Sequence, residues 1–171
     1  MAPKGHKQGD PEGHEQAHPK AHPKQILIDG DACPVKEEIY KAAYRHNIPV
    51  RLVAGSYLRH PNHPLISMEM AGDGFDAADD LIFEAATPAS LVVTADILLA
   101  ERCLEKGAAV LNHKGAAFTA NSIGTQVATR AIMADIRAGL DGQGIGGQRP
   151  FSNKDRSSFS NALETALRRL T

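Results

Sequence analysis

The sequence predicts an α/β fold, in which a central and mostly parallel sheet is flanked by helices. Short apolar runs of strand length alternate along the chain with segments whose apolar residues recur at helical spacing. The strand-like runs are apolar at consecutive positions, a pattern typical of parallel strands buried on both faces. Repeated strand–helix units place helices over such a sheet. The 171 residues and the 42% hydrophobic fraction fit one domain, assigned to residues 25–171.

Residues 25–86 predict three strands and two helices. The first apolar run ends in Asp29 and is a buried strand. Pro34 suits the first position of a helix, where its missing N–H has no effect. Asp76 is the expected N-cap of a second helix, with Asp79 three residues later. In chain order, the expected elements are a strand at 25–29, a helix at 34–46, strands at 49–54 and 65–70 around a loop at 58–64, and a helix at 76–86.

The rest of the chain predicts two strands, three helices and a glycine-rich loop. Gly107 is the expected C′ residue of the first of these helices, because glycine tolerates the left-handed conformation found there. Ser152 is the expected cap of the last helix. In chain order, the expected elements are a strand at 91–94, a helix at 97–106, a final strand at 108–111, a helix at 122–138, a loop at 140–150 and a helix at 154–170.

Residues 1–24 predict a disordered tail that is rich in histidine and proline. The segment holds four histidines and almost nothing apolar, so it cannot bury enough surface to offset its ordering entropy. The histidines are irregularly spaced, which favours a solvated extension over a transition-metal-binding tract.

The overall composition gives no general attraction to nucleic acid, because the formal net charge is −1. Two cysteines provide neither a zinc spacing nor a disulfide framework. No stretch approaches the ~20 apolar residues of a membrane span, and the N-terminus lacks the apolar core of a secretory signal. We therefore expect a cytoplasmic protein that does not associate with membranes.

Six aspartates fall where one site can collect them. Asp29 lies at the carboxyl end of the first expected strand and Asp96 just past that of the fourth, where open parallel sheets bind ligands. Asp31, two residues after Asp29, projects to the same side if strand geometry persists. Three further acids share one helical face, because they are three and four residues apart: Asp76, Asp79 and Asp80.

Crowded carboxylates repel one another, so a folded protein tolerates them only if some are protonated or a cation lies among them. Oxygen-only ligands favour Mg²⁺ or Mn²⁺ over zinc. Such an ion activates water and neutralises the charge that builds on a phosphoryl oxygen during phosphodiester cleavage. The expected metal ligands are Asp29, Asp76, Asp79 and Asp96, and the expected catalytic residues are Asp29, Asp31 and Asp96.

Ordinary structural roles remain open for most of these acids. Asp76 and Asp96 each precede an expected helix and could serve only as N-caps. Asp31 could be a turn residue beside Gly30, and Asp80 a solvated helix charge. Asp29 is the hardest to explain structurally, because a buried strand rarely ends in a carboxylate that has no partner.

Four runs carry a family resemblance: residues 29–36 (DGDACPVK), 74–79 (GFDAAD), 94–100 (TADILLA) and 146–152 (GGQRPFS), the last followed by Asp155 and Arg156. Together they resemble the uncharacterised bacterial YaiI/YqxD family over roughly residues 26–170. That family looks like a branch of the PIN-like nuclease superfamily. The resemblance implies a three-layer PIN-like domain with acids gathered around Mg²⁺ or Mn²⁺ at the carboxyl edge of the sheet.

Three basic residues near the start of the last helix are candidates for holding a substrate phosphate. Arg149, Lys154 and Arg156 flank the glycine-rich loop, and the helix N–H groups would assist them. The alternative is a solvated basic turn. Cys33 follows the first acidic pair, and neighbouring carboxylates should raise its thiol pKa, which favours packing over a nucleophilic role.

The leading hypothesis is a Mg²⁺- or Mn²⁺-dependent nuclease, with RNA favoured over DNA as the nucleic-acid partner by analogy with the superfamily alone. One alternative is a non-catalytic nucleic-acid- or partner-binding domain that keeps a metal site. Another is a haloacid-dehalogenase-type phosphatase, which also begins from Asp-x-Asp after a first strand. In that enzyme class, Asp29 would be the nucleophile and Asp31 the acid/base.

Overall fold

The strands and helices follow the predicted order, with one addition near the middle of the chain. The computed structural model describes residues 21–139 and 149–171. Its strands are β1 (Gln25–Asp29), β2 (Val50–Ala54), β3 (Ile66–Met70), β4 (Ser90–Val93), β5 (Ala109–Leu111) and β6 (Ala117–Phe118). Its helices are α1 (Lys36–His46), α2 (Ala77–Ala85), α3 (Ile97–Glu105), α4 (Ala120–Gly139) and α5 (Asn153–Arg169).

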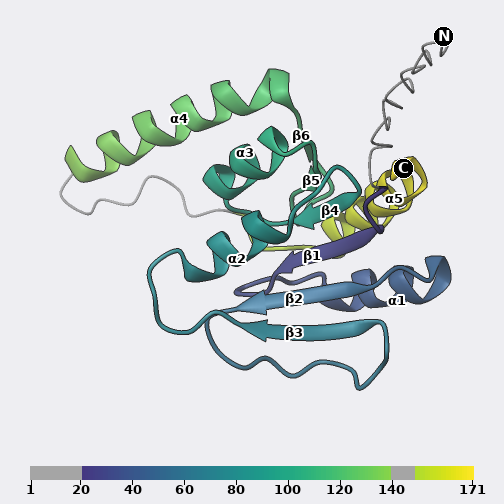
Figure 1. Cartoon of the computed structure of the whole chain (residues 1–171). Helices are drawn as coiled ribbons and strands as arrows, with labels where there is room; N and C mark the ends of the chain where they lie inside the picture. The colour runs from purple at the N-terminus through teal and green to yellow at the C-terminus, as the bar shows by residue number, and fades with distance from the viewer. Residues whose placement is uncertain (1–20, 140–148) are drawn as a thin grey trace, which may run out of the picture.

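The strands form one sheet with the order β3-β2-β1-β4-β5-β6 (Figure 1). The first five strands are parallel, and β6 runs antiparallel to β5. At the centre, Ile28 of β1 lies beside Leu52 of β2 on one side and Val93 of β4 on the other. Strands β2 and β3 are added on one side of β1, and the next strand in the chain, β4, is added on its other side. Such a switch in strand order opens a crevice beyond the carboxyl ends of the strands, where α/β proteins bind ligands.

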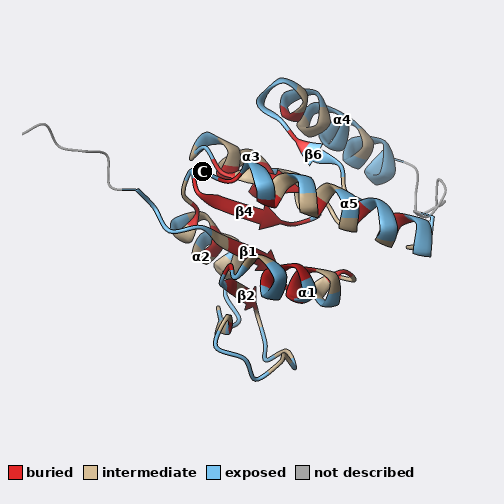
Figure 2. Cartoon of the chain, turned by 90° about the vertical axis from the view of Figure 1, so that its right-hand side faces the viewer, coloured by how far each residue is buried: buried red, intermediate tan, exposed pale blue. Residues whose placement is uncertain are grey.

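Two apolar cores lie on opposite faces of the sheet, which gives the three layers. Alternate strand residues face opposite sides, so Ile26 and Ile28 pack with α1 and α5, whereas Leu27 packs with α2 and α3. In Figure 2 the buried stripes of α1 and α5 turn toward the strands. The predicted α/β architecture with a mostly parallel sheet is confirmed.

Helix α4 is the longest helix and the least buried. It lies alongside α3 at the outside of its layer and is almost entirely exposed (Figures 1 and 2), with only Ile123 buried. Helix α4 therefore contributes little to the core. No helix of the described residues is both long and apolar enough to cross a membrane.

Two local predictions were wrong, and a third is confirmed in position only. The strand at 109–111 is not the last, because Ala117 and Phe118 pair back onto it after a turn; two residues are too few for a recognisable apolar run. The first helix begins at Lys36, because Pro34 and Val35 form a turn that precedes it. Asp76 occupies the N-cap position of α2 but makes no capping hydrogen bond, and its φ of 56° is left-handed.

Most of the predicted tail and of the glycine-rich loop lies outside the described residues. Residues 21–24 are exposed and have no regular structure. Of the loop predicted at 140–150, only Arg149 and Pro150 are described, and both are exposed.

Candidate functional site

The carboxyl ends of β1 and β4 are joined by the side chain of Thr94. Its hydroxyl donates a 2.8 Å hydrogen bond to Oδ2 of Asp29 and accepts a 3.0 Å hydrogen bond from the backbone N–H of Asp96. Thr94 is completely buried and directly follows β4. One hydroxyl therefore fixes the positions of two predicted site residues at the switch point of the sheet.

Asp96 combines a structural role with an available oxygen. Its Oδ1 caps α3 by accepting hydrogen bonds of 2.8 Å from the Leu98 N–H and 3.1 Å from the Leu99 N–H. Its Oδ2 accepts no hydrogen bond within the described residues. The capping interpretation is thus confirmed, and it leaves one carboxylate oxygen for a ligand.

Asp31 is held against the end of β2. Its Oδ2 accepts a 3.1 Å hydrogen bond from the N–H of Gly55. The preceding Gly30 donates to the Val53 carbonyl at 2.7 Å, and a Cβ on Gly30 would lie 2.7 Å from Leu52 Cδ1. Only glycine fits between the two acids, so the tight packing against β2 sets the path of the chain from Asp29 to Asp31.

The acids of α2 separate into two groups. Asp80 is exposed and pairs with Arg102 of α3 at 2.8 Å, which makes it a structural charge. Asp76 is exposed at the helix start. Asp79 is half-buried, and the charges of Asp96 and Asp29 both contribute to raising its pKa.

Acids from three segments of the chain affect one another's pKa values. The pKa of Asp79 is raised to about 6, mainly by burial and then by the charges of three neighbouring acids, Asp96, Asp29 and Asp76. The charge of Arg102 acts in the opposite direction. Burial also raises the pKa of Asp29, with contributions from Asp31 and Asp96, against the lowering effect of the Thr94 hydrogen bond. The cluster thus carries more negative charge than the nearby protein groups neutralise.

A hard divalent cation suits this donor set, which consists of carboxylate oxygens in a region of excess negative charge. Among the described residues, no group of three or more His, Cys, Asp and Glu side chains is arranged to enclose a metal ion. The described side chains therefore do not form a complete metal site by themselves. Mg²⁺ typically keeps several waters and binds one or two carboxylates together with substrate phosphates.

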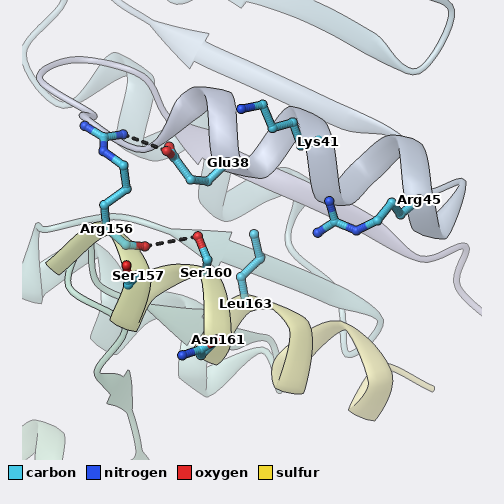
Figure 3. A pocket seen from close by; sticks show the side chains of 8 residues that line it. All are labelled: Glu38, Lys41, Arg45, Arg156, Ser157, Ser160, Asn161 and Leu163. Atoms are coloured by element: carbon cyan, nitrogen blue, oxygen red, sulfur yellow. Dashed lines mark hydrogen bonds and ion pairs between the residues drawn. The ribbon is translucent and has the colours of Figure 1, made fainter. Parts of the chain in front are cut away.

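Two of the three predicted basic residues near α5 are engaged within the protein. Arg149 donates to Asp155 at 2.8 Å. The Asp155 carboxylate itself accepts from the Ser152 N–H, which together with Arg149 lowers its pKa to about 2 and places a negative charge at the start of α5. Arg156 donates at 2.8 Å to Glu38 of α1 (Figure 3) and at 3.0 Å to the Pro34 carbonyl. Lys154 is exposed.

The cleft drawn in Figure 3, about 460 Å³ in volume, lies between α1 and α5. It contains none of the six aspartates. Its two arginines are already paired, Arg156 with Glu38 and Arg45 with Glu164. The cleft is therefore a neutralised seam between two helices, separate from the acidic cluster.

Sequence reasoning missed Thr94 and the loop after β5. Thr94 ends a predicted apolar strand and begins the run 94–100 that carries the family resemblance, but neither feature predicts that its hydroxyl joins Asp29 to Asp96. The loop after β5 brings Asn112, His113 and Lys114 to the same edge of the sheet, where they line a cavity beside Ala95. The predicted final strand gave no reason to single them out.

Comparison with known proteins identifies close relatives. The family model described as "Uncharacterized BCR, YaiI/YqxD family" matches residues 27–169. A UPF0178 protein of Jannaschia sp. (strain CCS1) is 83% identical over 145 residues, which cover 85% of this chain and 93% of the relative. A UPF0178 protein of Sphingopyxis alaskensis is 59% identical, covering 85% and 94%. A UPF0178 protein of Rhodopseudomonas palustris (strain CGA009) is 51% identical, covering 85% and 91%. No solved structure matches the chain.

Proposed function

The chain belongs to the YaiI/YqxD family, and we propose that it is a Mg²⁺- or Mn²⁺-dependent nuclease that hydrolyses phosphodiester bonds, with RNA as the favoured substrate. The observation that carries this proposal is the Asp29–Thr94–Asp96 arrangement at the switch point of the sheet. It fixes two carboxylates where an α/β fold binds its ligand. The preference for RNA rests on the resemblance to PIN-like nucleases.

The residues that would contact the ion, directly or through its bound waters, are Asp29, Asp79 and Asp96, with Asp76 exposed at the start of α2. A bound Mg²⁺ or Mn²⁺ would supply positive charge for the phosphoryl oxygens and acidify water at neutral pH. Thr94 orients Asp29 by donating to one of its oxygens, which leaves the other for the ion.

Asp31 is the protein group best placed to position water. Its Oδ2 is anchored by the Gly55 N–H, and the side chain is exposed beside Asp29. The other carboxylate oxygen can accept a hydrogen bond from a water that approaches the phosphorus. Geometry of this kind contributes by orientation rather than by forming a covalent intermediate.

The test is a cleavage assay with the purified full chain. Labelled single- and double-stranded RNA and DNA are incubated with Mn²⁺, Mg²⁺ or EDTA, in parallel with Asp29→Asn. We expect cleavage that requires the divalent ion and falls at least roughly a hundredfold in Asp29→Asn, while circular dichroism shows an unchanged fold. Asp80→Asn is the matched control, because Asp80 pairs with Arg102 outside the proposed ligands.

Two results would reject the proposal. If the wild type cleaves no nucleic acid yet binds Mn²⁺ in calorimetry, the site serves binding instead. If Asp29→Asn cleaves as fast as the wild type, any activity belongs to another site or to a contaminant.

A further inference from the structure

Two cavities meet at the loop that carries Asp96. The first, about 340 Å³, is lined by residues from the loops after β1, β4 and β5 and by Phe151. The second, about 540 Å³, follows α4 as far as Arg137. Ala95, Ile97 and Gln126 line both, so the two form one continuous depression, here called the α4 groove.

The α4 groove is strongly basic although the chain as a whole has a net charge of −1. Its lining includes Lys114 in the first cavity and Arg130 and Arg137 in the second, against a single acid, Asp96. Arg149 also lines the first cavity, but Asp155 neutralises its charge. Arg130 and Arg137 are exposed, and neither forms an ion pair with any of the described residues. This side of the molecule therefore suits an anionic chain.

The spacing of the two arginines also suits a repeating anion. Seven residues of α-helix are two turns, so Arg130 and Arg137 share one helical face about 10 Å apart. The two guanidinium groups can therefore contact different phosphates of one strand. Thr125 lines the same cavity on the N-terminal side of Arg130 and adds a hydroxyl group to it.

The first cavity is lined by groups that can hold a nucleobase. Phe151 and Phe118 contribute aromatic rings, and Asn112 and Gln126 contribute amides. The Nε2 atom of His113 is buried and has no hydrogen-bond partner among the described residues. Burial and the Lys36 charge lower the pKa of His113, so its neutral ring adds a polar atom without a described partner to the wall of this cavity.

We propose that the α4 groove binds a single-stranded nucleic acid, with one base in the cavity beside His113 and the following phosphates along Arg130 and Arg137. The backbone then passes Asp96 on its way between the two cavities. This inference rests on the proposed nuclease function and names the form of its substrate. A duplex is disfavoured, because its bases are stacked and paired and cannot enter the cavity.

Binding is measured without cleavage, in EDTA, by fluorescence anisotropy of labelled oligonucleotides of roughly 12 nucleotides. The variant is Arg130→Glu/Arg137→Glu. The matched control is Arg168→Glu/Arg169→Glu, which makes the same charge change on exposed residues at the end of α5. There Arg169 lies near Pro88 and Gly107, at the opposite edge of the sheet.

The wild type should bind single strands at least roughly tenfold more tightly than a duplex of the same length. The groove variant should lose roughly tenfold or more in affinity, and its plot of log K against log salt should be shallower by about 1.4, as expected for two lost phosphate contacts on a single strand. The control should change neither the preference for single strands nor the salt dependence by a comparable amount. His113→Ala should weaken single-strand binding without altering the salt slope.

The inference is overturned if the wild type binds no single strand in EDTA, if duplex binds as well as single strands, or if the groove and control variants lose affinity equally. These outcomes are separable from the nuclease proposal. Single-strand binding that is lost in the groove variant, without cleavage in Mn²⁺ by the wild type, supports the groove and rejects the nuclease. If the groove variant still cleaves and binds single strands as tightly as the wild type, the nuclease proposal is supported and the groove proposal is rejected. Circular dichroism verifies that each variant folds.

Discussion

At the scale of single residues, the arrangement of the acids depends on the hydroxyl of Thr94. Thr94→Val keeps the shape of the side chain but removes its hydrogen bonds to Asp29 and to the Asp96 N–H. Because both groups would lose a partner in a buried setting, we expect a loss of about 1–3 kcal/mol in the free energy of unfolding. Urea denaturation measures this loss, and calorimetry with Mn²⁺ should show weaker binding.

Thr94→Ser is the rescue variant, since it restores the hydroxyl with one methyl fewer. It should recover most of the Mn²⁺ affinity even if it unfolds at a somewhat lower urea concentration. Equal Mn²⁺ binding by the valine variant and the wild type would show that Thr94 supports the fold but does not position Asp29.

Gly30 is the second residue whose identity the site requires. In Gly30→Ala the new Cβ would lie 2.7 Å from Leu52 Cδ1, 2.9 Å from Leu58 Cδ1 and 3.0 Å from the Val53 carbonyl oxygen. The two methyl groups can move, but the carbonyl belongs to the sheet, so we expect a destabilisation of about 1–3 kcal/mol. Thermal unfolding followed by circular dichroism measures the change.

Gly124 provides the matched control for Gly30. It lies in α4, and a Cβ there meets no atom within 4 Å. Gly124→Ala should therefore stabilise the protein by up to about 1 kcal/mol through helix propensity. If the two substitutions have equal effects, the contacts around Gly30 are not what requires glycine.

At the scale of elements, the start of α5 is fixed by a capping box. The Ser152 hydroxyl accepts from the Asp155 N–H, and the Asp155 carboxylate accepts from the Ser152 N–H. Ser152→Ala removes half of this exchange and should lower the free energy of unfolding by about 1 kcal/mol. Ser157→Ala, exposed on the same helix, should stay within about 0.5 kcal/mol of the wild type. If the free energies of unfolding of the two variants differ by less than about 0.5 kcal/mol, the capping box does not stabilise the helix as proposed.

The elements that the sequence predicted well are those with a periodic apolar pattern. β1 occupies its predicted residues, and α3 ends one residue before its predicted end, with Gly107 in the left-handed conformation at φ 80°. The predictions fail where strand pairing or turn geometry, and not a periodic apolar pattern, determines the secondary structure. β6 exists because two residues find a partner in β5, and the start of α1 depends on a turn at Pro34 that the proline itself did not reveal.

At the scale of the whole molecule, the acids could be predicted from the sequence but the groove could not. Asp29 and Asp96 end or follow apolar strands, and parallel topology then places them at one edge. Arg130 and Arg137 gave no such signal, because solvent-exposed arginines are ordinary on any helix. Their relation to Asp96 and to the loop after β5 arises only when α4 packs alongside α3. The acids of the site can thus be predicted from local sequence, whereas the basic residues of the α4 groove are brought to it by tertiary structure.

The same scale decides how the stability of the molecule varies with pH. A carboxyl whose folded-state pKa is raised stabilises the fold fully below its unfolded value, and this contribution is lost as pH rises through the folded value. For Asp79 the interval runs from 3.8 to about 6, and Asp29 acts in the same direction. Without a divalent ion, the cluster should therefore destabilise the folded chain progressively over this interval.

Mn²⁺ or Mg²⁺ should reverse this loss, because an ion bound among ionised carboxylates stabilises the folded state by about 1.4 kcal/mol at ten times its dissociation constant. The melting temperature, measured with and without the ion, should rise by a few degrees at pH values above 6 and by much less near pH 4, where Asp79 is protonated. Asp79→Asn should flatten the pH dependence in the absence of metal and reduce the shift that the ion produces. Asp80→Asn, which leaves the cluster intact, should alter neither. An equal shift at both pH values, or one that Asp79→Asn does not reduce, would place the ion somewhere other than the carboxyl ends of β1 and β4.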